Sequence, residues 1–229
     1  MISEFFFASR GEASAAAASR LHDALASALS QQDKASIVLS GGSTPADTFK
    51  RLSRMPLAWD RVTVTLSDER WVPADHEDSN TRMLRNTLLT HQAQHAATLN
   101  LFRDGVDVAA ALPQLEADFC ALPLPFASVL LGMGEDGHFA SLFPDFAGLR
   151  DALNLQSDAA FVPVSTAASP HPRISMTLSA LLKSHEVILL IFGAAKRRVY
   201  EDAKAGVNTL PIATLLAQTH VPLRVIWAP

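Results

Sequence analysis

The sequence is poor in cysteine and in long apolar runs, and it has no excess of basic residues. A single cysteine excludes an intramolecular disulfide and any cysteine-rich metal site. The longest apolar run, residues 187–192, is far shorter than the roughly 20 residues that a membrane-spanning helix needs. No basic region precedes the short run Phe5–Phe7, so the N-terminus does not resemble a signal peptide, and we expect a cytoplasmic protein.

The charge balance limits the partners. Lys and Arg number 19 and Asp and Glu number 23, which gives a formal net charge of -4. Nucleic acids and acidic membrane surfaces attract proteins with a broad basic field, so we expect neither as a partner. A single phosphate group is a different kind of ligand, because a few local charges and backbone amides suffice to bind it.

The length and composition predict one globular domain that covers residues 1–229. Hydrophobic residues make up 48% of the chain and charged residues 18%. Surface scaling predicts that about 72% of the unfolded chain's surface becomes buried on folding, which is ample for a core. No linker, internal repeat or shift in composition divides the chain.

Helical and strand patterns alternate along the chain. Short apolar runs predict strands at residues 36–40, 62–66, 128–131, 187–192 and 223–227. Helical spacing predicts helices at residues 11–29, 79–90, 108–122 (interrupted by Pro113) and 194–203, and a helix capped by Thr44 from Pro45 to about residue 54. Continuous apolar strands alternating with helices indicate an α/β fold with a parallel sheet covered on both faces. Cys120, among apolar residues, is predicted to lie in the core.

Four of the predicted strands end in Gly-rich or polar loops. In a parallel sheet these loops meet at the carboxyl edge, where ligands of open α/β sheets bind. The alternative is that turns between strands and helices are simply rich in such residues. The loops are Ser40-Gly-Gly-Ser-Thr44, Ser67-Asp-Glu-Arg70, Gly132-Met-Gly-Glu-Asp-Gly-His138 and Gly193-Ala-Ala-Lys196.

The first loop is suited to an anion. Consecutive backbone N–H groups around Gly42, with the hydroxyls of Ser43 and Thr44, can surround a phosphate. The loop lacks the lysine and the spacing of a P-loop, which disfavours a nucleoside triphosphate. In the alternative interpretation, Ser43 or Thr44 only caps the following helix.

The third loop matches the G-x-G-x-x-G pattern, but its context disfavours a dinucleotide. Pro144 interrupts the helix that should hold the pyrophosphate, and the carboxylate of Asp136 would face it. Asp136 and His138 suit proton transfer better, because a neutral imidazole can take a proton from water while a carboxylate orients it. The alternatives are a structural histidine and a metal ligand, and we predict no metal at this pair, since no second ligand set accompanies it.

Two cations and two further charged residues complete the candidate site. Lys196 and Arg173 could bind a phosphate, although each taken alone is better explained as a solvated surface charge. Asp68 and Arg70, with Glu69 between them, suit the recognition of sugar hydroxyls or, alternatively, a local ion-pair network.

With these motifs assembled, the chain resembles the 6-phosphogluconolactonase family over nearly its whole length. The matching segments, in the family's order, are Leu39-Ser-Gly-Gly-Ser-Thr-Pro45, Asp68-Glu-Arg-Trp-Val-Pro73, Asp78-Ser-Asn80, Leu131-Gly-Met-Gly-Glu-Asp-Gly-His138, Ala140-Ser-Leu-Phe-Pro144, Pro172-Arg-Ile-Ser-Met-Thr177 and Gly193-Ala-Ala-Lys196. The resemblance implies a three-layer α/β/α Rossmann-like fold with a mostly parallel sheet. It also implies hydrolysis of a small-molecule sugar phosphate lactone, 6-phospho-D-glucono-1,5-lactone, without a cofactor or metal.

By the same resemblance, His138 is the general base and Asp136 orients it. Gly42, Ser43, Thr44, Arg173 and Lys196 would bind the phosphate, and Asp68 and Arg70 the sugar. One position departs from the family, since Phe139 stands where lactonases usually have Thr.

Two alternatives to the lactonase remain open. One is a related amino-sugar-phosphate deaminase or isomerase. Deaminases have a segment of the type Gly-His-x-x-x-Asn-Glu-Pro that supplies a glutamate, and the matching residues 139–144 carry no carboxylate. The other is a non-catalytic sugar-phosphate sensor, for which the sequence shows no basic DNA-binding module.

Overall fold

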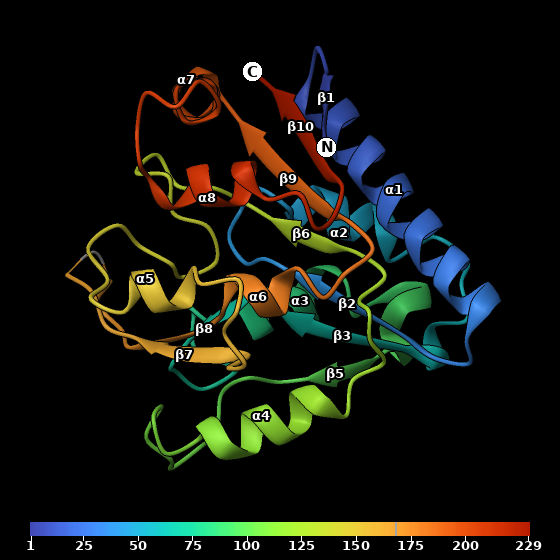
Figure 1. Ribbon diagram of the computed structural model, residues 1–229. Coiled ribbons are helices and arrows are strands. Elements are labelled where there is room, and N and C mark those ends of the chain that lie inside the picture. Colours follow the sequence, from blue (N-terminus) through green and yellow to red (C-terminus); the bar gives the residue numbers. More distant parts are fainter. Residues whose placement is uncertain (168) are drawn as a thin grey trace.

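A seven-stranded sheet forms the centre of the computed structural model, which describes residues 1–167 and 169–229 (Figure 1). Each pair of neighbouring strands in it is parallel. The strands in spatial order are β1 (Ile2–Phe6), β10 (Leu223–Ala228), β9 (Val187–Phe192), β6 (Val129–Leu131), β2 (Ala35–Leu39), β3 (Val62–Leu66) and β5 (Ala97–Leu99). The inner strands are buried on both faces, which explains why their sequences are continuous apolar runs.

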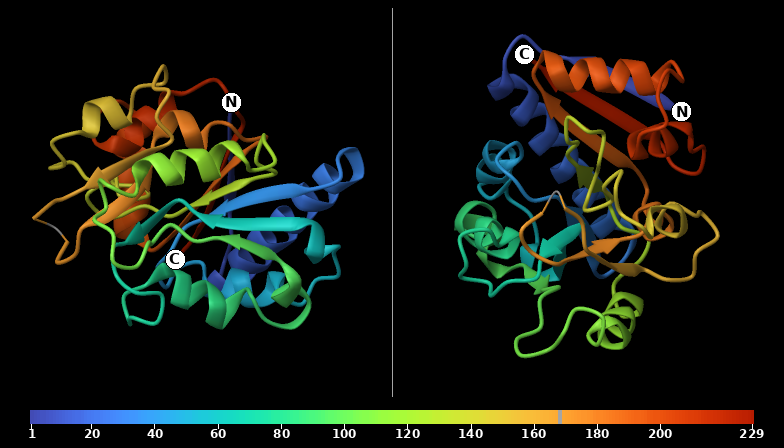
Figure 2. Two further views of the ribbon diagram at one scale, coloured as in Figure 1. Left: turned by 90° about the horizontal axis from the view of Figure 1, so that it is seen from below. Right: turned by 90° about the vertical axis from the view of Figure 1, so that its left-hand side faces the viewer.

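Helices cover both faces of this sheet, as Figure 2 shows, so the predicted three-layer α/β/α fold is confirmed. Connections that run toward β5 carry α1 (Arg10–Gln31), α2 (Ala46–Leu52) and α3 (Asn80–Thr87). Connections that run back toward β1 carry α4 (Leu112–Cys120), α5 (Leu149–Ala152), α6 (Leu178–Leu181), α7 (Ala194–Lys204) and α8 (Pro211–Ala217). Since crossovers between parallel strands are right-handed, the two directions place their helices on opposite faces.

Helix α1 illustrates how the sequence sets these elements. Ser9 accepts a hydrogen bond from the Glu12 backbone N–H, and the Glu12 carboxylate accepts one from the backbone N–H of Ala8. The first contact satisfies an N–H group that the first helical turn leaves free, and the second fixes the chain just before the helix. Small residues and leucines at helical spacing then bury one face of α1 against the sheet.

A second, three-stranded antiparallel sheet lies beyond the carboxyl end of β3. It pairs β4 (Asp68–Arg70) with β8 (Arg173–Met176), and β8 with β7 (Phe161–Val164). The prediction of a loop at residues 67–70 was therefore wrong, because residues 68–70 form a strand. The three residues of β4 are polar, so no apolar period marks them as a strand.

Other local predictions need correction. Pro45, and not Thr44, is the N-cap of α2, and that helix ends at Leu52. Pro113 does not interrupt α4 but lies in its first turn, where its missing N–H costs nothing. The helix predicted at residues 79–90 is α3, which is capped by Ser79 and ends at Thr87. Cys120 is exposed at the end of α4 and is not a core thiol.

The topology fixes where a ligand site can form. The chain leaves β2 toward β5 and leaves its neighbour β6 in the opposite direction, so the order of the sheet reverses between these two strands. Loops diverge at such a point and leave a crevice beyond the carboxyl ends of the strands. Of the helices in the described part of the chain, none is long and apolar enough to cross a membrane.

Candidate active site

A pocket of about 250 Å³ lies at this reversal point. The loops after β2, β3, β6 and β9 all contribute to its lining, so the predicted convergence of four strand ends is confirmed. Every residue predicted for the site lines the pocket except Asp136, which reaches it through His138. The predicted residues among the lining are Gly42, Ser43, Thr44, Asp68, Arg70, His138, Arg173 and Lys196.

His138 and Asp136 form a close pair in the loop after β6. The Nδ1 atom of His138 lies 2.6 Å from Oδ1 of Asp136, and the imidazole is 28% exposed. A Cβ atom on Gly134 would lie 2.2 Å from that Nδ1, so only glycine lets the loop fold this tightly around the pair. The carboxylate fixes the hydrogen-bonding role of Nδ1 and leaves Nε2 as the nitrogen free to exchange a proton.

The loop after β2 presents backbone and hydroxyl groups to the pocket. Gly42 is exposed and has a φ of 88°, and Ser43 and Thr44 follow it along the rim. Within the described residues, no side chain caps α2, so capping does not account for the hydroxyls of Ser43 and Thr44. These groups are therefore available to a ligand.

Asn80 holds this loop in place and was missed by the sequence analysis. Its Nδ2 donates to the backbone carbonyl of Asp68 at 3.0 Å, and its side chain lies so close to Gly41 that a Cβ there would be 1.9 Å from Oδ1. Asn80 also lines the pocket. Its presence in the Asp78-Ser-Asn80 segment was noted, but nothing in that segment indicates the contact with Gly41.

Lys196 and Arg173 are the cations of the pocket. Lys196 is half-buried in the first turn of α7, and none of the described residues forms an ion pair with it. Burial lowers the pKa of the Lys196 ammonium, and the charge of Glu135 opposes this shift. An unpaired cation that is partly shielded from water is well placed to bind an anion.

Arg173, in contrast, is held by protein groups. Its Nε donates to Oγ of Ser169 at 2.8 Å, and one Nη donates to Oγ of Ser141 at 3.3 Å. Burial lowers the pKa of the guanidinium, and the carboxylate of Asp68, 3.7 Å away, opposes the shift. Its guanidinium carbon lies 5.2 Å from the ring centre of Phe143, and the same ring lies 4.3 Å from that of His138. The ring of Phe143 thus contacts both Arg173 and His138, and no motif predicts this arrangement.

Asp68 is less free than Arg70. One carboxylate oxygen of Asp68 accepts from Ser67 at 2.9 Å and the other from Ser141 at 2.6 Å. Arg70 uses one Nη to donate to the backbone carbonyl of Asp78, while its buried Nε has no hydrogen-bond partner in the described part of the chain. An unpaired buried donor beside a pocket is costly unless a ligand or water satisfies it.

Glu69, which lies between these two residues in the sequence, holds neighbouring residues of the site in place. It is fully buried, and its carboxylate accepts hydrogen bonds from the backbone N–H groups of Arg70, Asn80 and Thr81. Burial raises the pKa of Glu69, and these donors oppose the shift. From the sequence, Glu69 was grouped with Asp68 and Arg70 as a candidate for sugar recognition or for a local network, and its buried contacts are of the second kind. Its contacts tie β4 to the start of α3 and so fix both Arg70 and Asn80.

The comparisons with known proteins agree with this geometry. Residues 8–227 match the family model described as glucosamine-6-phosphate isomerases/6-phosphogluconolactonase. The chain is 41% identical to a 6-phosphogluconolactonase of Caulobacter vibrioides, over 97% of this chain and 95% of that protein. A crystal structure of a 6-phosphogluconolactonase from Shewanella baltica superimposes with a TM-score of 0.93, at 35% identity over 100% of this chain and 98% of that one.

A third comparison concerns the fold alone. A monomeric glucosamine-6-phosphate deaminase superimposes with a TM-score of 0.75, at 19% identity over 97% of this chain and 96% of that one. The same three-layer architecture is thus present in proteins named for two activities. The family match and the extent of identity lead to one conclusion: the chain belongs to the family of glucosamine-6-phosphate isomerases and 6-phosphogluconolactonases.

Proposed function

We propose that the protein hydrolyses 6-phospho-D-glucono-1,5-lactone to 6-phospho-D-gluconate, the second step of the oxidative pentose phosphate pathway. One observation carries this proposal: a histidine–carboxylate pair opens onto the same pocket as an unpaired lysine and a glycine–hydroxyl loop. The names of the similar proteins point to the same reaction. In this proposal residues 1–229 act as a single domain.

The phosphate binds between the loop after β2 and the two cations. Backbone N–H groups near Gly42 and the hydroxyls of Ser43 and Thr44 donate to its oxygens, and Lys196 and Arg173 supply positive charge. Lys196 contributes most to affinity, because it has no competing ion pair within the described chain, whereas Arg173 already donates to Ser141 and Ser169. Hydrogen bonds to a charged group contribute about 1.5–3 kcal/mol each.

The chemistry then needs only a proton acceptor and water. Nε2 of His138 takes a proton from a water molecule, whose oxygen attacks the lactone carbonyl carbon. The tetrahedral intermediate collapses by breaking the bond to the ring oxygen, which receives the proton back from His138. Asp136 holds the imidazole through Nδ1 and stabilises its charged form. General acid–base catalysis of this kind contributes about 10²–10⁴-fold to the rate.

Asp68 and Arg70 are proposed to bind the sugar part of the substrate, and their contributions differ. Arg70 has a buried Nε that a sugar oxygen can satisfy. Both carboxylate oxygens of Asp68 already accept hydrogen bonds from serines, so its larger contribution is to hold Arg173 in position. A contact between Asp68 and a sugar hydroxyl would use the remaining lone pairs of its carboxylate.

The main rival is deamination of an amino sugar phosphate, because one deaminase shares the fold. The segment after His138, residues 139–144, contains no carboxylate, and the ring of Phe139 is fully buried. No acid is therefore available there to act on an amino group. A non-catalytic sensor of sugar phosphates would bind the same ligands through the same pocket.

A direct assay separates these functions. The purified protein is given freshly prepared 6-phosphogluconolactone, and formation of 6-phosphogluconate is followed above the spontaneous rate. We expect rapid, enzyme-dependent hydrolysis and no release of ammonia from glucosamine 6-phosphate. Ammonia release without lactone hydrolysis would identify a deaminase, and binding without turnover of either substrate would identify a sensor.

A further inference from the structure

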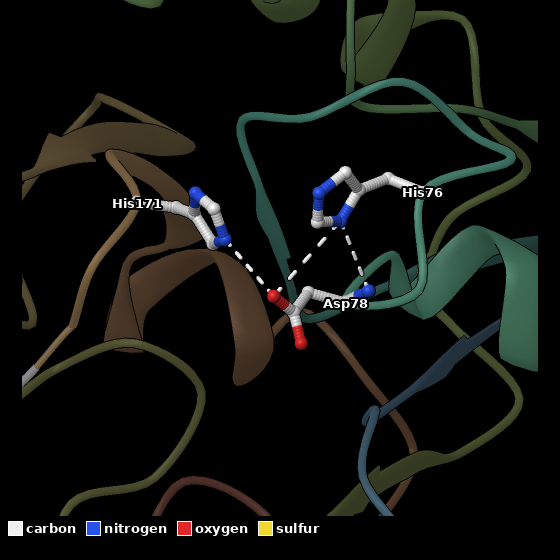
Figure 3. Close-up of side chains that lie close together, drawn as sticks. All are labelled: His76, Asp78 and His171. Carbon is white, nitrogen blue, oxygen red and sulfur yellow. Dashed lines mark hydrogen bonds and ion pairs between the residues drawn. The ribbon is translucent and has the colours of Figure 1, made fainter.

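Two histidines and an aspartate come together at a place outside the pocket lining. His76 and Asp78 lie in the segment between β4 and α3, and His171 lies just before β8 (Figure 3). Nε2 of His171 is 2.9 Å from Oδ2 of Asp78, and Nδ1 of His76 is 3.9 Å from the same oxygen. One ligand atom from each residue lies within 4.8 Å of the other two. The three side chains thus point at one small volume from two segments far apart in the sequence.

Each of the three side chains offers an atom that can ligate a metal, in exchange for a hydrogen bond that it makes now. Nδ1 of His76 accepts a hydrogen bond from the backbone N–H of Asp78 at 3.1 Å, so this nitrogen carries a lone pair and not a proton. Nε2 of His171 lies 2.9 Å from Oδ2 of Asp78, and when it donates a hydrogen bond there it carries a proton, which an ion must displace before this nitrogen can ligate. Arg70 donates to the backbone carbonyl of Asp78 and leaves the carboxylate to the histidines.

The distances are close to those of a bound zinc ion. Ligand atoms at 2.0–2.2 Å from a tetrahedral Zn²⁺ lie roughly 3.3 Å from one another. The spacings in this cluster exceed that value by no more than about 1.5 Å, which side-chain rotations can close. Two imidazoles and one carboxylate suit Zn²⁺ and similar divalent ions better than Mg²⁺ or Ca²⁺, which prefer oxygen ligands. All three side chains are partly exposed, so an ion can enter and retain water.

We propose that His76, Asp78 and His171 form a binding site for a divalent transition-metal ion, with Zn²⁺ the best match. The sequence analysis predicted no metal ligand, because the two histidines belong to segments whose proximity only the fold creates. An ion there would join the segment that follows Arg70 to the segment that precedes Arg173. These two segments are already neighbours, since Arg70 pairs with Arg173 across β4 and β8 and Trp71 N–H donates to the carbonyl of Pro172.

The site is separate from the proposed chemistry. None of its residues lines the pocket as described, and His138 and Asp136 belong to a different loop. A bound ion would cross-link the segments next to the two strands that carry Arg70 and Arg173. It would thereby stabilise this part of the fold. The proposal therefore holds or fails independently of which sugar phosphate the pocket accepts.

The test uses tag-free, metal-stripped full-length protein titrated with ZnCl₂ in a calorimeter. We expect one equivalent to bind in the wild type. Zinc at a hundred times its dissociation constant should raise the melting temperature by roughly 5–10 °C. His76→Ala and His171→Ala should each weaken binding at least about tenfold, since even partners of metal ligands cost that much. His95→Ala, which removes an exposed histidine elsewhere, should leave binding unchanged.

A second readout guards against binding by other surface groups. Cobalt(II) added to the wild type should give the visible absorption of a four- or five-coordinate ion, and the double variant His76→Ala/His171→Ala should lack it. Melting of each variant without metal checks that it folds. If the wild type does not bind one equivalent of zinc, the proposal is wrong. It is also wrong if the folded double variant binds zinc as tightly as the wild type.

Discussion

The two ends of strand β9 carry contrasting charged groups. At the amino end, Glu186 is 3% exposed and lies between two guanidinium groups. Arg20 donates to both of its oxygens at 2.9 Å, and Arg224 donates to Oε2 at 2.7 Å. Each charge in this cluster meets an opposite charge, and the cluster ties α1 to β10 and to the start of β9.

At the carboxyl end of the same strand, one charge is left without an ion pair among the described residues. Lys196 has no ion pair in the described part of the chain, and burial lowers its pKa. The nearby His138–Asp136 pair opens onto the pocket. Burying a charge costs free energy unless it is paired, so a fold that leaves such a group at a pocket gives up stability there. The difference teaches that charges held in ion pairs maintain the fold, whereas a cation without an ion pair is available to a ligand.

Replacement of His138 tests the carboxyl end most strongly. His138→Ala should lower kcat by about 10²–10⁴-fold, because the water loses its proton acceptor, while the melting temperature changes little. Asp136→Asn should cause a smaller loss, since the imidazole remains but is less well oriented. Steady-state kinetics of lactone hydrolysis measure both effects. His220→Ala removes an exposed histidine far from this loop and serves as the control. Wild-type turnover in His138→Ala would remove it as the base.

Replacement of Lys196 tests the unpaired charge itself. Lys196→Ala should raise KM by roughly 10–100-fold, because one charge-assisted hydrogen bond to the phosphate contributes about 1.5–3 kcal/mol. The melting temperature should stay the same or rise, since a partly buried ammonium is removed. Arg198→Ala, on the exposed side of the same helix, is the matched control. An unchanged KM would place Lys196 outside the phosphate site.

Substitution at the amino end of β9 should lower stability and leave activity unchanged. Glu186→Gln should lower the free energy of unfolding by about 1–3 kcal/mol, because two guanidinium groups lose a buried counter-charge. The kcat and KM values should not change. Asp47→Asn breaks the exposed pair with Arg51 and should cost under about 0.5 kcal/mol. Urea denaturation measures both variants, and loss of activity in a folded Glu186→Gln protein would contradict the division between the two ends.

The pH dependence of ligand affinity is the smallest expected effect. The lowered pKa of Lys196 means that its ammonium loses its proton at a lower pH than an ordinary lysine. The cation is present below that pKa and absent above it, so the affinity for 6-phosphogluconate should fall by up to about tenfold as pH rises through it. Calorimetric titrations between pH 7 and 10 measure this, and Lys196→Arg should flatten the curve. A fall of equal size in Lys196→Arg would assign the effect to another group.

Much of this account could be predicted from the sequence, because the inner strands are short apolar runs and each is followed by a loop of distinctive composition. A parallel sheet brings its strand ends to one edge, so Ser43, His138 and Lys196 could be placed together without coordinates. The residues that a strand end contributes to the site can thus largely be predicted from the local sequence.

Contacts between segments without apolar patterns could not be predicted. Strand β4 is polar, and its pairing with β8 depends on residues about a hundred positions away. The roles of Glu69 and Asn80 follow from that pairing, because both hold the chain between β4 and α3. Phe143 is an ordinary apolar residue in sequence, and only the fold places its ring between His138 and Arg173. The proximity of His76 to His171 has the same origin.

The central claim is that Lys196, at the carboxyl end of β9, recognises a phosphate together with the loop after β2 and Arg173. The most direct test compares kcat/KM for 6-phosphogluconolactone with kcat/KM for unphosphorylated glucono-1,5-lactone. We expect the wild type to prefer the phosphorylated lactone by roughly 10²–10⁴-fold, as two or more charge-assisted hydrogen bonds imply, and Lys196→Ala to lose at least about tenfold of that preference. Equal kcat/KM values for the two lactones in the wild type would contradict the account.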